Sequence, residues 1–94
     1  MEHEGLVNQI LTEEESLLKS HRQHIDDNVE LFKGQMQMLN DVDKPGSDVE
    51  GYTHALEGVL QQNMDMIKGL MGQVNRFKNM LGKEKKISDR FYEA

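Results

Sequence analysis

The sequence predicts an all-α protein in which two long helices are joined by a short Pro-Gly turn, as a helical hairpin or coiled coil. Three observations predict this fold. The only proline among the 94 residues is Pro45, and Gly46 follows it near the middle of the chain. Long stretches on both sides are rich in Leu, Met, Glu, Gln and Lys, which favour helix. Apolar residues in these stretches recur at three, four and seven residues, the spacing of one helix face.

The first helix is expected from about residue 6 to residue 42. Its most regular apolar row repeats every seven residues: Leu11, Leu18, Ile25, Phe32 and Leu39. A neighbouring row contains Ile10, Leu17, His24, Leu31 and Met38, and a polar line lies beside both: Glu14, His21, Asn28 and Gln35. Because the apolar arc is wide and carries polar residues, it suits a bundle better than a strict two-stranded zipper.

A turn is expected at residues 43–47. Pro45 cannot continue a helix that began before it, and it disfavours helical angles at Lys44. Gly46 tolerates the backbone angles that a reversal needs. Ser47 and Glu50 have the spacing of a capping box, which predicts a new helix that starts at Ser47.

The second helix is expected from about residue 48 to residue 83, followed by a flexible tail at residues 84–94. Its apolar row alternates steps of three and four, with Asn63 as a polar residue that can set register: Thr53, Leu56, Leu60, Asn63, Ile67, Leu70, Val74, Phe77 and Leu81.

Each helix has an apolar arc wider than one neighbour can cover, so the hairpin is expected to form a homodimer, a four-helix bundle. The predicted core and dimer interface comprises Leu18, Ile25, Phe32, Leu39, Leu56, Leu60, Asn63, Ile67, Leu70, Val74 and Phe77. The alternative is a monomeric adaptor, in which a Met-rich groove between the helices receives a helix of a partner protein.

Composition and charge exclude several function classes. The net charge is −6, and residues 1–43 hold ten acids against three bases, which argues against nucleic acid as a partner. No apolar run is long enough to cross a membrane, and no cysteine is present. His21, His24 and Asp27 have ligand-like spacing on a helix, but no further ligand accompanies them. No catalytic, cofactor-binding or metal-binding residue is therefore predicted, and the chain is not expected to be an enzyme.

Several stretches resemble the C-terminal region of the kinesin-13 family, the microtubule-depolymerising kinesins with an internal motor domain. They are Glu13-Glu14-Glu15, Leu17-Leu18, the run from His21 to Asp26, and the run from Met38 to Ser47. Tyr52, Val59-Leu60, Arg76-Phe77 and Leu81 extend the similarity into the second helix.

The resemblance implies a non-catalytic dimerisation, regulatory and targeting module, from which the motor domain with its ATP and Mg sites is absent. It also implies a cytoplasmic, cytoskeletal location on microtubules, at the spindle or centrosome. The motor domain, tubulin or microtubule-associated proteins are then further partners, with neither nucleic acid nor membrane among them.

Overall fold

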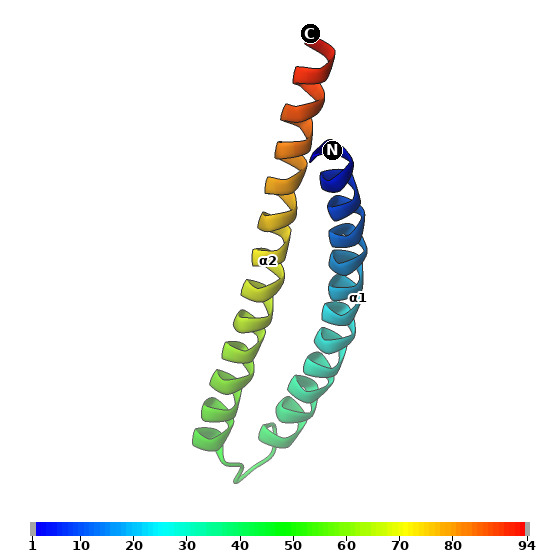
Figure 1. The fold of residues 1–94 in the computed structure, drawn as a ribbon. Coiled ribbons are helices and arrows are strands. Elements are labelled where there is room, and N and C mark those ends of the chain that lie inside the picture. Colours follow the sequence, from blue (N-terminus) through cyan, green and yellow to red (C-terminus); the bar gives the residue numbers. More distant parts are fainter. Residues whose placement is uncertain (1, 94) are drawn as a thin grey trace. The chain divides into compact units, whose positions relative to one another are not determined.

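The computed structural model describes the backbone of residues 2–93 and the side chains of residues 4–86. Two helices make up the fold: α1 is Glu2–Val42 and α2 is Val49–Glu93 (Figure 1). No strand occurs among the described residues. The two helices pack against each other as a hairpin, so the predicted all-α class and the hairpin are confirmed.

The chain divides into two compact units, which are described separately. The turn unit is Arg22–Gly69, and it contains the end of α1, the turn and the start of α2. The terminal unit combines Met1–His21 with Leu70–Ala94.

Both helices extend further than the sequence analysis expects. α1 begins at Glu2 rather than near residue 6, and α2 continues to Glu93, where a tail from residue 84 is expected. No proline or glycine follows Gly82, and Lys and Glu in that stretch favour helix. Nothing in the local sequence therefore stops α2 at residue 83.

A side chain of the turn donates a hydrogen bond to a free backbone carbonyl at the C-terminal end of α1. The Ser47 hydroxyl donates a 2.7 Å hydrogen bond to the carbonyl oxygen of Val42, the last residue of α1. The Ser47 amide donates to the Lys44 carbonyl at 3.2 Å. Gly46 between them has φ of 78°, which is the left-handed region where residues with a Cβ are strained. The Pro-Gly pair predicted from the sequence therefore makes the reversal itself.

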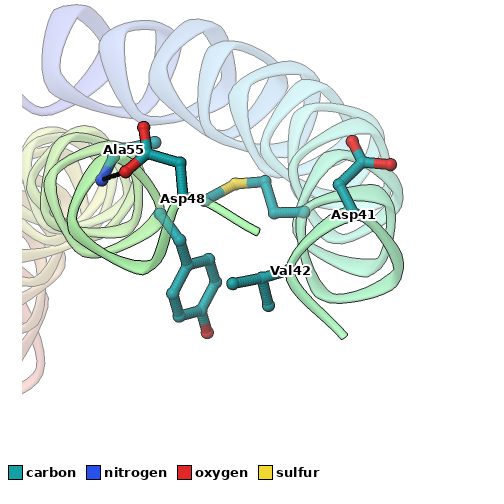
Figure 2. A pocket seen from close by; sticks show the side chains of 7 residues that line it. Asp41, Val42, Asp48 and Ala55 are labelled. Carbon is teal, nitrogen blue, oxygen red and sulfur yellow. Dashed lines mark hydrogen bonds between the residues drawn. The ribbon is translucent and has the colours of Figure 1, made fainter. Parts of the chain in front are cut away.

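Asp48 caps α2, which is one residue later than the predicted cap at Ser47. The Asp48 carboxylate accepts a 2.9 Å hydrogen bond from the Gly51 amide, as an N-cap side chain does (Figure 2). The predicted box with Glu50 does not form, because the Ser47 hydroxyl is engaged with the end of α1. Gly51 leaves room for the cap, since a Cβ there would collide with the Asp48 carboxylate.

In the turn unit, α1 and α2 leave the turn side by side (Figure 1) and contact each other through a half-buried line on each helix. We call these lines the hairpin contact. On α1 it consists of His24, Asp27, Asn28, Leu31, Gln35, Met38 and Val42, and on α2 of Tyr52, Leu56, Val59, Asn63 and Met66. The α1 side mixes polar and apolar residues, whereas the α2 side is apolar except for Asn63.

The terminal unit has the same kind of contact. Gln73 donates a 3.2 Å hydrogen bond to the Ser16 hydroxyl across it. The half-buried residues there include Ile10, Leu17, Leu70, Phe77 and Met80. No residue with a described side chain, apolar or polar, is fully buried in either unit. The described chain has no closed core of its own.

Candidate interaction surface

A continuous apolar row lies exposed along α1 in the turn unit. Its members are 45–66% exposed: Ile25, Val29, Phe32, Met36 and Leu39. Each of them follows a residue of the hairpin contact by one position; Phe32, for example, follows Leu31. The most regular apolar row predicted from the sequence is therefore not the row that holds the hairpin together.

A matching row lies exposed along α2. Leu60, Met64 and Ile67 are 46–50% exposed. They follow Val59, Asn63 and Met66 of the hairpin contact by one position each.

The two rows point to the same side of the turn unit. One residue along an α-helix corresponds to a rotation of about 100°. The hairpin-contact residues of α1 and α2 face each other, and each exposed row lies one residue further along its helix. Because the two helices run in opposite directions, this one-residue step rotates the side-chain direction clockwise on one helix and anticlockwise on the other, when both are viewed from the turn. Both exposed rows therefore point to the same side. We call the resulting surface the apolar face, made of Ile25, Val29, Phe32, Met36, Leu39, Leu60, Met64 and Ile67.

The opposite side of the turn unit is polar. A shallow groove of about 500 Å³ there is lined by Asp27, Glu30, Leu31, Gln62 and Met66. Nearer the turn lies a smaller hollow of about 270 Å³ (Figure 2). Its lining combines two carboxylates with apolar side chains: Met38, Asp41, Val42, Asp48, Gly51, Tyr52 and Ala55. Because carboxylates line both hollows, this side of the turn unit is a solvated surface. The apolar face therefore lies on one side of the turn unit.

The terminal unit repeats the pattern more sparsely. Leu11, Leu18, Met71 and Leu81 are 44–54% exposed. Each of them also follows a half-buried residue by one position: Ile10, Leu17, Leu70 and Met80.

The predicted interface residues fall into two groups. Six of them are exposed, at 46–55%: Leu18, Ile25, Phe32, Leu39, Leu60 and Ile67. Five are half-buried inside the hairpin of this chain: Leu56, Asn63, Leu70, Val74 and Phe77. Four further exposed residues are missing from the predicted interface, although each lies three and four residues from members of it: Val29, Met36, Met64 and Met71.

Asn63 is a polar residue inside the hairpin contact. Its side-chain oxygen is enclosed and has no hydrogen-bond partner. An enclosed amide oxygen without a donor destabilises the contact that surrounds it. The hairpin contact is thus weakened at Asn63, whereas the apolar face contains no polar side chain.

Other kinds of site are not found in the part of the chain that is described. No group of three or more His, Cys, Asp or Glu side chains in that part is arranged to hold a metal ion. Neither helix, over its described residues, has a stretch apolar and long enough to span a bilayer.

Two curated proteins are similar to this chain over most of its length. One is kinesin-like protein KIN-13A from Oryza sativa subsp. japonica, at 33% identity over 84 residues, which is 89% of this chain and 10% of the relative. The other is kinesin-like protein KIN-13B from Arabidopsis thaliana, at 32% identity over 75 residues, which is 80% of this chain and 11% of the relative. No family model and no solved structure matches.

The chain spans about a tenth of the length of these relatives. The similarity covers both helices and the turn between them, since it extends over four fifths or more of the chain. It agrees with the resemblance carried by the His21–Asp26 and Met38–Ser47 runs. By sequence, this helical hairpin is related to the kinesin-13 proteins.

Proposed function

We propose that this chain is a non-catalytic homodimerisation module of a kinesin-13 protein. The observation that carries the proposal is the apolar face, which is exposed on a hairpin whose described residues include no buried one. Monomeric proteins rarely leave a contiguous apolar surface of this kind in water. A second copy offers an identical face, and symmetric homodimers are the commonest way to cover one.

The size of the driving force supports association. Full burial of a large apolar side chain contributes about 1.5–3 kcal/mol, so burial of the exposed half contributes about 1 kcal/mol. Thirteen large apolar side chains are 44–66% exposed. Their summed contribution exceeds the lower estimates of the cost of association, about 4 kcal/mol.

The relatives suggest which kind of protein contains such a module. Both are described as kinesin-like proteins, and this chain corresponds to about a tenth of each. In the proposal, ATP hydrolysis and microtubule depolymerisation belong to a motor domain elsewhere in the protein. The hairpin joins two such chains, and it regulates or targets them on microtubules of the cytoskeleton. The motor domain and tubulin are the partners expected beyond the second copy.

A second candidate is a monomeric adaptor that binds a helix of another protein. Three methionines favour it: Met36, Met64 and Met71 are 66%, 50% and 54% exposed. Methionine is flexible and polarizable, and surfaces rich in it adapt to different partner helices.

Light scattering of the isolated chain over a concentration series separates the two functions. The homodimerisation module should have the mass of two chains, about 22 kDa from a 10.9 kDa chain, at micromolar concentration. Circular dichroism on the same samples should show that helix content falls as the dimer dissociates on dilution. A chain that stays monomeric, helical and cooperatively folded at high concentration would contradict the proposal and favour the adaptor.

A further inference from the structure

We propose that the turn units of two copies pair in parallel, with their apolar faces together and their turns at the same end. This inference rests on the proposed homodimer and adds its geometry. In this arrangement, α1 of the turn unit lies against the partner's α2. The occupant of the apolar face is a second copy of this chain, and the pairing uses residues of Arg22–Gly69 alone.

Two symmetric arrangements can join one face of each turn unit to the same face of a second copy. In a two-fold dimer of this kind the axis lies in the interface, either along the helices or across them. An axis along the helices gives the parallel dimer, in which α1 lies against the partner's α2. An axis across the helices gives an antiparallel dimer, in which α1 lies against the partner's α1. The two arrangements bring different residues together, so the order of residues along each row distinguishes them.

The hollows of the turn unit show which residues of α1 and α2 lie at the same distance from the turn. The groove on the polar side is lined by Leu31 with Gln62, and by Asp27 with Met66. In each of these pairs the residue numbers add up to 93. The hollow nearer the turn has two pairs with the same sum (Figure 2): Met38 with Ala55, and Val42 with Gly51. Residues of α1 and α2 whose numbers add up to about 93 therefore lie at one level.

The exposed apolar residues of the two helices occur at matching levels. By the same sum, three pairs are level to within one residue: Ile25 with Ile67, Val29 with Met64, and Phe32 with Leu60. All six side chains are about half exposed in the single chain. Because an axis along the helices leaves every level unchanged, the parallel dimer sets each of them against a large apolar residue of the partner. Nearer the turn, Met36 and Leu39 are level with the polar residues Glu57 and His54, so the apolar pairing ends there.

Charged residues border this pairing in an order that suits the parallel dimer. Asp26 lies within one residue of the level of Lys68, and Lys33 lies within three residues of the level of Glu57. Arg22 has the same charge as Lys68, but it lies three residues from that level, further away than Asp26. All five side chains are exposed in the single chain. In the parallel dimer the acid is thus the charge of α1 nearest to the partner's Lys68.

The two apolar rows have different centres, which does not suit an antiparallel pairing of two turn units. The exposed row of α1, over residues 25–39, is centred on Phe32. The exposed row of α2, over residues 60–67, is centred near Met64, which is level with Val29. An axis across the helices has to be central to both rows at once. The centres are three residues apart, about 4.5 Å along the helices, so one row is always displaced.

Either choice of centre in the antiparallel pairing leaves a large apolar residue without an apolar counterpart. Centred on Phe32, the pairing brings Ile67 to the level of the partner's Ala55, which is outside the apolar face. Centred on Val29, it brings Phe32 to the level of the partner's Asp26. The parallel pairing has neither mismatch, and the apolar pattern therefore favours it.

The area of the apolar face is sufficient for a dimer. An aromatic side chain buries about 150–250 Å² in full, and aliphatic side chains bury somewhat less. The eight members of the apolar face, each about half exposed, therefore offer on the order of 600 Å² per chain. Two copies together reach about 1,200 Å², the lower end of the range for stable specific interfaces.

Single cysteines test the orientation, because the chain contains no cysteine of its own. Val29→Cys chains and Met64→Cys chains, mixed and treated with a short bismaleimide, should give the mixed cross-linked dimer as the main product. In the parallel dimer Val29 meets the partner's Met64, whereas the two copies of Val29 are separated by the width of the bundle. Gln62→Cys, at a similar distance from the turn but on the polar side, is the matched control and should not cross-link to Val29→Cys.

Two results of this experiment would overturn the parallel orientation. Self-linked Val29→Cys chains as the main product would do so, because only an axis across the helices brings this residue to its own copy. The same holds for a mixture that forms no mixed cross-link although light scattering shows a dimer.

The distance between the two turns gives a second test that does not alter the apolar face. A spin label on Lys44→Cys, in the exposed turn, reports this distance by double electron–electron resonance. In the parallel dimer the labels should be less than about 25 Å apart, since neighbouring helices of a bundle are about 8–10 Å apart. In an antiparallel dimer centred on Phe32, twelve residues separate each label from the centre, which sets the labels about 36 Å apart.

A spin label on Gln62→Cys is the control for this measurement. Gln62 lies near the middle of the turn unit, so the distance between its two copies changes little with orientation and shows that a dimer is present. Lys44 labels about 36 Å or more apart in such a dimer would overturn the parallel orientation. A chain that is monomeric in light scattering would instead contradict the proposed homodimer itself.

Discussion

Phe32→Ala is expected to weaken self-association strongly, because Phe32 is central to the apolar face and 55% exposed in the single chain. Burial of the exposed part of a phenylalanine contributes about 1–1.5 kcal/mol. A symmetric dimer contains two copies, so the loss is about 2–3 kcal/mol per dimer. That corresponds to a rise of about 30- to 150-fold in the dimer dissociation constant. The change deletes no residue of the hairpin contact, so it acts mainly on the association.

Sedimentation equilibrium over a dilution series measures this change, with circular dichroism to follow helix content in parallel. Gln62→Ala is the matched control, because Gln62 lines the groove on the polar side at a similar distance from the turn. It should leave the dissociation constant within about two-fold of the wild type, as for a surface substitution. If Phe32→Ala associates as tightly as the wild type while Gln62→Ala does not, the interface lies on the other side and the reasoning about the apolar face is refuted.

Three further substitutions test the turn and the helices. Asp48→Ala should lower the free energy of unfolding by about 1 kcal/mol in a thermal melt, because the Gly51 amide loses its cap, whereas Asp48→Asn should retain most of it. Gly46→Ala should cost about 1–2 kcal/mol in a urea titration, since its φ of 78° is strained for any residue with a Cβ; an unchanged midpoint would mean that the turn can adopt other angles. Gly58→Ala should raise stability by about 0.5–1 kcal/mol in the same titration, because nothing lies within 4 Å of its Cβ position, and a loss of stability would indicate a second chain packed at that site.

The fold was predictable because its signals are local. Pro45 and Gly46 end one helix by backbone sterics alone, and the periodic apolar residues need no tertiary information to indicate helix. The cap was misplaced by one residue because the turn uses the Ser47 hydroxyl at the end of α1. Ser47 and Asp48 are both good N-cap residues, and the hydrogen bond from Ser47 to Val42 decides between them.

The candidate surface was only partly predictable. The sequence offers two adjacent apolar rows on α1, and the regular repeat through Leu18 and Phe32 is the more apolar of them. The hairpin nevertheless uses the row through His24 and Leu31, which is interrupted by polar residues. Which row faces α2 depends on the direction in which the turn returns the chain. The hydrophobicity of one helix does not reveal that direction. The predicted interface therefore mixed exposed residues such as Ile67 with residues of the hairpin contact such as Leu56.

In the proposed homodimer, this assignment of rows would couple folding to association. The enclosed, unpaired Asn63 oxygen lowers the stability of the hairpin contact, since a polar atom there loses water without gaining a hydrogen bond. The strongest apolar row is available only to a second molecule. Stability of the hairpin should then depend on protein concentration, because mass action links unfolding to dissociation. In the proposed homodimer, dissociation into monomers and loss of helix should therefore occur in one step, and circular dichroism and light scattering over the same dilution series should show coincident transitions.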